Sequence, residues 1–197
     1  MSNSAAAALE QPQKAVSNGI LGMLFLLTTE AMLFAGFISS LIVNRATDTI
    51  WPPPGQPRLP VEATFVNTLI LLASGVIYAV YARKYKSSGG DKSTIKFLLA
   101  ALLLGIVFVS VQGYEWMRLL GFGLTTKSNL YGAYFYMIIG AHALHVAVGI
   151  TLLSYLAVFI KKGQTFGRAC DKITITGMYW YFVVAIWPLL YYLVYIL

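Results

Sequence analysis

Glu30 is a carboxylic acid in the middle of an apolar stretch of the sequence. Residues 19–43 (GILGMLFLLTTEAMLFAGFISSLIV) can cross a hydrocarbon core of ~30 Å as a helix, and Glu30 then lies roughly 17–20 Å from either end. An ionisable group at that depth costs about 2.5 kcal/mol or more and therefore indicates function. A proton-carrying role is favoured, because a glutamine would bond to neighbouring helices equally well. A hydrogen bond to Thr28, Thr29 or a facing helix is the alternative.

Four further polar residues in apolar segments form two pairs with a spacing of three. Gln112 and Glu115 make the first pair, and His142 and His145 make the second. Residues three apart share one face of a helix. Glu115 lies near the end of its segment, so a partly hydrated surface carboxylate is an open alternative. The two histidines are too few for a complete metal site, and buried histidines hydrogen-bonded to facing helices are the favoured interpretation.

The sequence lacks the residues that redox cofactors and common catalytic sites require. It has two histidines and one cysteine, Cys170, and contains no Cys-x-x-Cys-His, phosphate-binding loop or dinucleotide fingerprint. We therefore expect no catalytic residue, no metal and no cofactor in this chain. Two classes of function remain: a non-catalytic subunit of a larger membrane complex, or a small transporter that uses Glu30 and the histidines as a proton relay. The absence of an obvious inverted repeat disfavours the transporter.

Composition predicts an all-α, polytopic membrane protein. Hydrophobic residues make up 58% of the 197 residues and charged residues 11%, less than half the usual share in a soluble domain. The net charge of +7 does not indicate nucleic-acid binding, because the basic residues fall in short loops between apolar segments. We expect a mobile tail at 1–17 and one transmembrane domain at 18–197, with helices at about 18–44, 64–82, 94–119, 130–160 and 173–197.

The last of these segments is rich in aromatic residues, which we expect mostly at the membrane interface or facing lipid. They are Tyr179, Trp180, Tyr181, Trp187, Tyr191, Tyr192 and Tyr195.

The distribution of Lys and Arg predicts the orientation in the membrane. Loops 83–96 and 161–172, together with Lys14 in the tail, carry ten basic residues. The opposite side carries four, which are Arg45, Arg58, Arg118 and Lys127. Because cytoplasmic loops are enriched in basic residues, we expect a cytoplasmic N-terminus and an external C-terminus.

Several short motifs follow one another along the chain. They are LLTTE (26–30), WPPPG (51–55), Asn67-Thr68 with LASG (72–75), QGYE (112–115), Tyr131-Gly132-x-x-Phe135, Gly140-x-His142-x-Leu144-His145-Val146-x-x-Gly149, and Tyr179-Trp180 with Trp187 and Tyr191. In these motifs, from about residue 19 onward, the chain resembles subunit III of the haem–copper oxidases, in the five-helix bacterial form. Tyr181 and Val184 depart from the pattern, since the family commonly has His and Asp there.

The resemblance implies a subunit without redox centres in a terminal respiratory oxidase, the cytochrome c oxidase that reduces oxygen to water and pumps protons. Haem and copper are then expected in the partner subunits. Subunit I is expected as the direct partner, with subunit II, a small subunit IV and a respiratory supercomplex as further partners, in a bacterial plasma membrane. Bound phospholipid is also implied. Glu30 would lie near the lipid and support proton uptake, and the structural polar residues would be Gln112, Glu115, His142 and His145.

Three alternatives stay open at this stage. Within the family they are a subunit of a quinol oxidase and an accessory protein of a nitric oxide reductase. From a different class, the alternative is a stand-alone proton-coupled carrier.

Overall fold

The computed structural model describes residues 17–48, 50–55, 59–163 and 165–197. Within these ranges the chain forms long helices and no strand, which confirms the predicted all-α class. The elements are α1 (Asn18–Thr47), α2 (Val61–Ser87), the 3₁₀ turn η2 (Lys92–Thr94), α3 (Ile95–Gly121), α4 (Leu130–Lys161), α5 (Phe166–Tyr191) and the π-helical turn η3 (Tyr192–Ile196). Five of the described helices are long and apolar enough to cross a membrane. Residues 1–16 and Arg58, which entered the predictions above, lie outside the described residues.

The helices extend beyond the apolar segments that predicted them. α2 runs from Val61 to Ser87 rather than from 64 to 82, and α5 begins at Phe166, seven residues before the predicted start at 173. Hydropathy marks the part of a helix that lies in hydrocarbon, whereas backbone hydrogen bonding continues into polar residues beyond it. The difference is therefore largest where charged residues flank the span.

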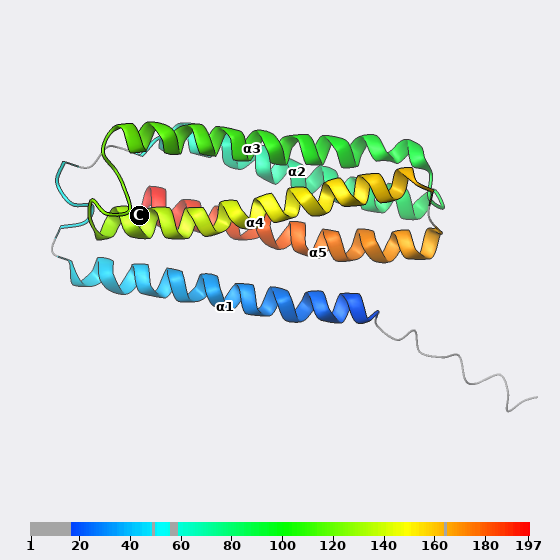
Figure 1. Ribbon diagram of the computed structural model, residues 1–197, viewed down its shortest axis with the longest axis horizontal. Helices are drawn as coiled ribbons and strands as arrows, with labels where there is room; N and C mark the ends of the chain where they lie inside the picture. The colour runs from blue at the N-terminus through cyan, green and yellow to red at the C-terminus, as the bar shows by residue number, and fades with distance from the viewer. Residues whose placement is uncertain (1–16, 49, 56–58, 164) are drawn as a thin grey trace, which may run out of the picture.

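The helices lie side by side, and α1 lies at the edge of the assembly. Figure 1 shows α4 and α5 between α1 and α3, and α1 contacts α4 and α5. Phe34 and Leu41 are the buried side chains of α1, whereas α5 has eleven buried residues. One end of the assembly carries residues 50–55 and the C-terminus, and is called the Trp51 end. The other carries the turn before α3 and is called the Lys92 end.

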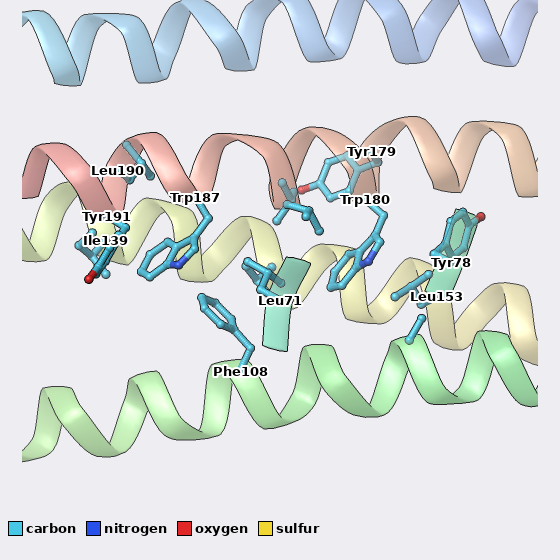
Figure 2. Packing of buried hydrophobic residues seen from close by; sticks show 14 of the residues in the cluster. Leu71, Tyr78, Phe108, Ile139, Leu153, Tyr179, Trp180, Trp187, Leu190 and Tyr191 are labelled. Atoms are coloured by element: carbon cyan, nitrogen blue, oxygen red, sulfur yellow. The ribbon is translucent and has the colours of Figure 1, made fainter. Parts of the chain in front are cut away.

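The core is centred on two tryptophans of α5. Trp180 and Trp187 are fully buried and point from α5 toward α3, with Leu71 between the two indoles and Phe108 beside Trp187 (Figure 2). A Cβ atom at Gly149 of α4 would lie 2.7 Å from the Trp180 ring, and one at Gly105 of α3 would lie 2.8 Å from it. Only glycine therefore lets α3 and α4 approach this indole closely.

The position of the aromatic residues of α5 and η3 corrects the sequence-based expectation. Tyr181 and Tyr192 are exposed, as expected for interface or lipid-facing residues. The other five aromatics named above are buried in the core, with at most 7% of each exposed. α5 contacts α1, α2 and α4 at once, so large rings on several sides of this helix meet protein rather than lipid.

Candidate functional site

The carboxyl of Glu30 meets the imidazole of His145 where α1 lies against α4. Oε2 of Glu30 is 2.8 Å from Nε2 of His145. The other ring nitrogen, Nδ1, is 2.6 Å from the carbonyl oxygen of Ala141, one turn earlier in α4. The side chain of His145 is 12% exposed and that of Glu30 is 23% exposed, so both are largely shielded from the surroundings.

These two contacts fix the number of protons that the pair holds. A carbonyl oxygen only accepts hydrogen bonds, so Nδ1 of His145 carries a hydrogen and donates it to Ala141. Nε2 then either donates to an ionised Glu30 or accepts from a protonated Glu30. Both arrangements place one proton between Glu30 and His145 and give the pair a net charge of zero. A neutral pair is far cheaper in a membrane than a lone carboxylate.

Side chains and backbone of three helices surround this pair. The ring of Phe34, from α1, lies 5.1 Å from the imidazole between centroids, and its side chain is buried. The hydroxyl of Tyr179, from α5, donates to the carbonyl oxygen of His145 at 3.2 Å. Thr28 and Thr29 instead donate to the carbonyl oxygens of Leu24 and Leu26 in their own helix, so they are not the partners of Glu30.

A second polar contact joins α1 to α4 near the Trp51 end. The hydroxyl of Tyr134 lies 2.7 Å from Oγ of Ser40, and Nδ2 of Asn44 donates to the same hydroxyl at 2.7 Å. Glu30, Ser40 and Asn44 therefore form a line along α1, and each meets a side chain of α4. Because α1 buries few apolar side chains, we expect these polar contacts to supply much of the free energy that holds α1 against α4.

The structure separates the two histidines that the sequence placed on one helix face. His145 faces α1, whereas His142 is 1% exposed and packs against Trp187 and Phe108, at centroid distances of 4.7 and 6.1 Å. Neither ring nitrogen of His142 has a hydrogen-bond partner among the described residues, so the expected hydrogen bond to a facing helix holds for His145 alone. Three residues correspond to 60° of rotation, enough to direct neighbouring rings to different helices.

Gln112 and Glu115 share one buried face, as predicted. They are 2% and 4% exposed, so Glu115 is a buried residue and not the surface carboxylate of the alternative. The hydroxyl oxygen of Thr64, from α2, lies 3.0 Å from Oε2 of Glu115. Nε2 of Gln112 donates to the hydroxyl of Tyr195 at 2.9 Å. This cluster lies in the core near the Trp51 end, apart from Glu30.

The geometry of these contacts offers hydrogen bonding and proton exchange. Among the described residues, no three His, Cys, Asp or Glu side chains group together as a potential metal site. The pairing of Glu30 with His145, and the role of Tyr134, were not predicted from the sequence. Both helices carried the relevant polar residues, but apolar segments alone do not say which helix faces which.

Comparison with known proteins identifies the family of this chain. The family model described as cytochrome c oxidase subunit III matches residues 3–197. The chain is 33% identical to cytochrome c oxidase subunit 3 of Loxodonta africana over 182 residues, which cover 88% of this chain and 67% of that protein. It is 31% identical to cytochrome c oxidase subunit 3 of the cyanobacterium Synechocystis over 178 residues, which cover 89% of this chain and 74% of that protein. The chain therefore belongs to the cytochrome c oxidase subunit III family.

Proposed function

We propose that this chain is the third subunit of a terminal haem–copper oxidase that reduces oxygen to water and pumps protons. It packs against subunit I, with subunit II and a small subunit IV in the same complex, and it holds no haem or copper itself. The observation that carries the proposal is the family match over residues 3–197.

The Glu30–His145 pair is the site through which this subunit supports proton uptake. It holds one transferable proton at no net charge, and Glu30 lies near the middle of α1, the thirteenth of its thirty residues. A net charge on the pair is costly at this depth. One proton can leave the pair as another enters, so the pair can pass protons on while its net charge stays at zero.

A groove between α1 and the end of the chain is the proposed phospholipid site. It has a volume of about 430 Å³ and is lined by Leu41, Ile42, Arg45, Ala46, Leu193 and Leu197. The lining is mostly apolar, which suits an acyl chain, and Arg45 suits the phosphate of the headgroup. The last turn of α1 places Arg45 at the Trp51 end, where headgroups of one leaflet would lie.

In the orientation proposed for the complex, the Lys92 end lies on the cytoplasmic side of a bacterial plasma membrane. In the described residues, that end carries nine Lys and Arg residues and the Trp51 end carries three. The excess supports a cytoplasmic Lys92 end and, with it, a C-terminus on the outside.

The test is extraction of native membranes in a mild detergent, capture of this chain through an N-terminal tag, and a reduced-minus-oxidised visible spectrum. We expect haem bands and a co-purifying large helical subunit. Bands of a-type haem support cytochrome c oxidase, and bands of b- or o-type haem point to a quinol oxidase or a nitric oxide reductase. A colourless preparation containing this polypeptide alone would contradict the proposal. Proton flux in liposomes that hold only this chain would then support a carrier.

A further inference from the structure

Glu115 lies in a second buried polar cluster, which shares no residue with the Glu30–His145 pair. The cluster consists of Thr64, Gln112, Glu115 and Tyr195, contributed by α2, α3 and η3. We propose that Glu115 is a proton-binding site that exchanges its proton with solvent at the Trp51 end through a small hydrated cavity. The ligands are a proton and one or two water molecules. This site is independent of the role proposed above for Glu30.

The contacts of Thr64 favour a protonated Glu115. Oγ1 of Thr64 lies 2.9 Å from the carbonyl oxygen of Pro60 and 3.0 Å from Oε2 of Glu115. A threonine hydroxyl has one hydrogen, whereas carbonyl and carboxylate oxygens only accept. If Glu115 is ionised, that single hydrogen is shared by two acceptors. If Glu115 carries the proton, it donates to Thr64, Thr64 donates to Pro60, and both contacts become full hydrogen bonds.

Two buried oxygens in the cluster require donors that the described residues do not supply. Oε1 of Glu115 and Oε1 of Gln112 have no hydrogen-bond partner, although both residues are buried. A buried acceptor without a partner costs about 1–3 kcal/mol. Native proteins usually satisfy such atoms with ordered water, which can donate two hydrogen bonds. The pattern of orphaned acceptors thus indicates water beside Glu115.

A cavity next to Glu115 has room for that water and leads toward solvent. Its volume is about 50 Å³, and it is lined by Glu115 together with Pro60, Arg118, Leu119 and Phe122. A water molecule needs at least ~10–15 Å³ of such space and takes up ~30 Å³ in the liquid, so one or two fit. Arg118 and Phe122 are exposed at the end of α3. Glu115 lies six residues before that end, about 9 Å along the helix.

Few charged or titratable groups act on Glu115. Arg118 comes from α3 itself, and Tyr195 comes from η3. Tyr131 of α4 is close enough to Tyr195 to interact with it electrostatically. α2 contributes the hydroxyl of Thr64, which does not titrate in water. A proton at Glu115 therefore exchanges with solvent beside one permanent cation, Arg118, which lies at the mouth of the cavity.

The experiment is infrared difference spectroscopy on the purified complex, reconstituted in sealed vesicles with one orientation. A protonated carboxyl has a carbonyl stretching band that a carboxylate lacks. We expect such a band to weaken when the pH is raised on the side of the Trp51 end, and to stay unchanged when the pH is raised on the opposite side. The band should be missing in Glu115→Gln. It should persist in Glu62→Gln, which removes an exposed carboxyl from the same end of the molecule.

A second variant keeps the test decisive if Glu115→Gln fails to assemble. Thr64→Val removes the hydroxyl but retains the shape, and should shift the frequency of the Glu115 band. The matched control is Thr151→Val, because the hydroxyl of Thr151 donates only to Ala147 in its own helix and is exposed. The proposal is overturned if native complex and Thr64→Val show the same carboxyl bands at every pH. It is equally overturned if the band ignores pH on both sides, or follows only the pH at the Lys92 end.

Discussion

Ala141 determines how His145 meets Glu30. Its carbonyl oxygen lies 2.6 Å from Nδ1 of His145 and accepts a hydrogen bond from that nitrogen. The ring is thereby held with Nε2 facing the carboxyl of Glu30, 2.8 Å away. The tautomer is therefore set by the backbone of α4 and not by the carboxyl. As a result the pair contains one proton whichever residue holds it, and α1 is joined to α4 without a net charge in the membrane.

Glu30→Gln is expected to preserve the fold, whereas Glu30→Ala is not neutral. The amide of a glutamine donates to the bare Nε2 of His145, so we expect the complex to lose less than about 1 kcal/mol of unfolding free energy. In Glu30→Ala, Nε2 is left without a partner, which costs about 1–3 kcal/mol. Denaturant titration of the purified complex, followed by release of this subunit, measures both. Equal stability of the two variants would contradict the proposed hydrogen bond.

The same glutamine variant separates a structural role of Glu30 from a proton-carrying role. Glutamine keeps the hydrogen bond but has no transferable proton, so we expect Glu30→Gln to lose sustained proton uptake earlier than the native oxidase at equal initial rate. The measurement is the number of turnovers before activity halves, in vesicles, with Glu62→Gln as the control for removal of a carboxyl. If Glu30→Gln lasts as long as the native complex, Glu30 only attaches α1.

Tyr134→Phe should loosen α1 without disturbing the core. The hydroxyl of Tyr134 meets both Ser40 and Asn44 at 2.7 Å, and its removal leaves their side chains without that partner. We expect a loss of about 1–2 kcal/mol and faster proteolysis of the connection between α1 and α2. Tyr155→Phe is the matched control, because Tyr155 is 50% exposed on the outside of α4. Identical proteolysis of the two variants would show that the Tyr134 contacts do not hold α1.

The fold was largely predictable from the sequence because the bilayer imposes it. A helix that crosses hydrocarbon must be apolar over about twenty residues, so composition alone identifies the five helical segments of 18–197. The ends were less predictable, since polar residues such as those preceding Ile173 extend a helix at no penalty in the headgroup region. The burial of most aromatic residues of α5 and η3 was also not predicted, because Trp and Tyr suit both an interface and a core.

The candidate site was predictable residue by residue but not as a set of contacts. Glu30 and His145 were each singled out by an ionisable group in an apolar segment. Their pairing depends on which faces of α1 and α4 meet, and in an apolar membrane helix the face toward protein resembles the face toward lipid. For the same reason the sequence did not separate His145 from His142. Their residue types and apolar surroundings located these residues in the sequence, and the structure assigned their partners.

Gly149→Ala tests the close packing of α4 against Trp180. The added Cβ would lie 2.7 Å from two atoms of the indole, which is fully buried and has little room to shift. We expect a loss of about 1–3 kcal/mol from overpacking. Gly140→Ala, in the same helix, places its Cβ 3.8 Å from Trp116, an ordinary contact, and should change stability little. Thermal unfolding of the two variant complexes makes the comparison; equal midpoints would show that Trp180 can move aside.

Arg45→Gln tests the phospholipid groove between α1 and the C-terminus. Arg45 is the cation that lines this mostly apolar groove, so its removal should weaken retention of anionic phospholipid several-fold during detergent washing. Ala46→Trp should displace the acyl chain as well, because the indole would fill much of the groove. Lys127→Gln, an exposed loop residue with the same change of charge, is the control. Bound lipid is counted by mass spectrometry of the intact complex. If Arg45→Gln and Ala46→Trp both retain the native complement of lipid, the lipid of this subunit lies elsewhere, and the wide exposed surface of α1 is the next candidate for its site.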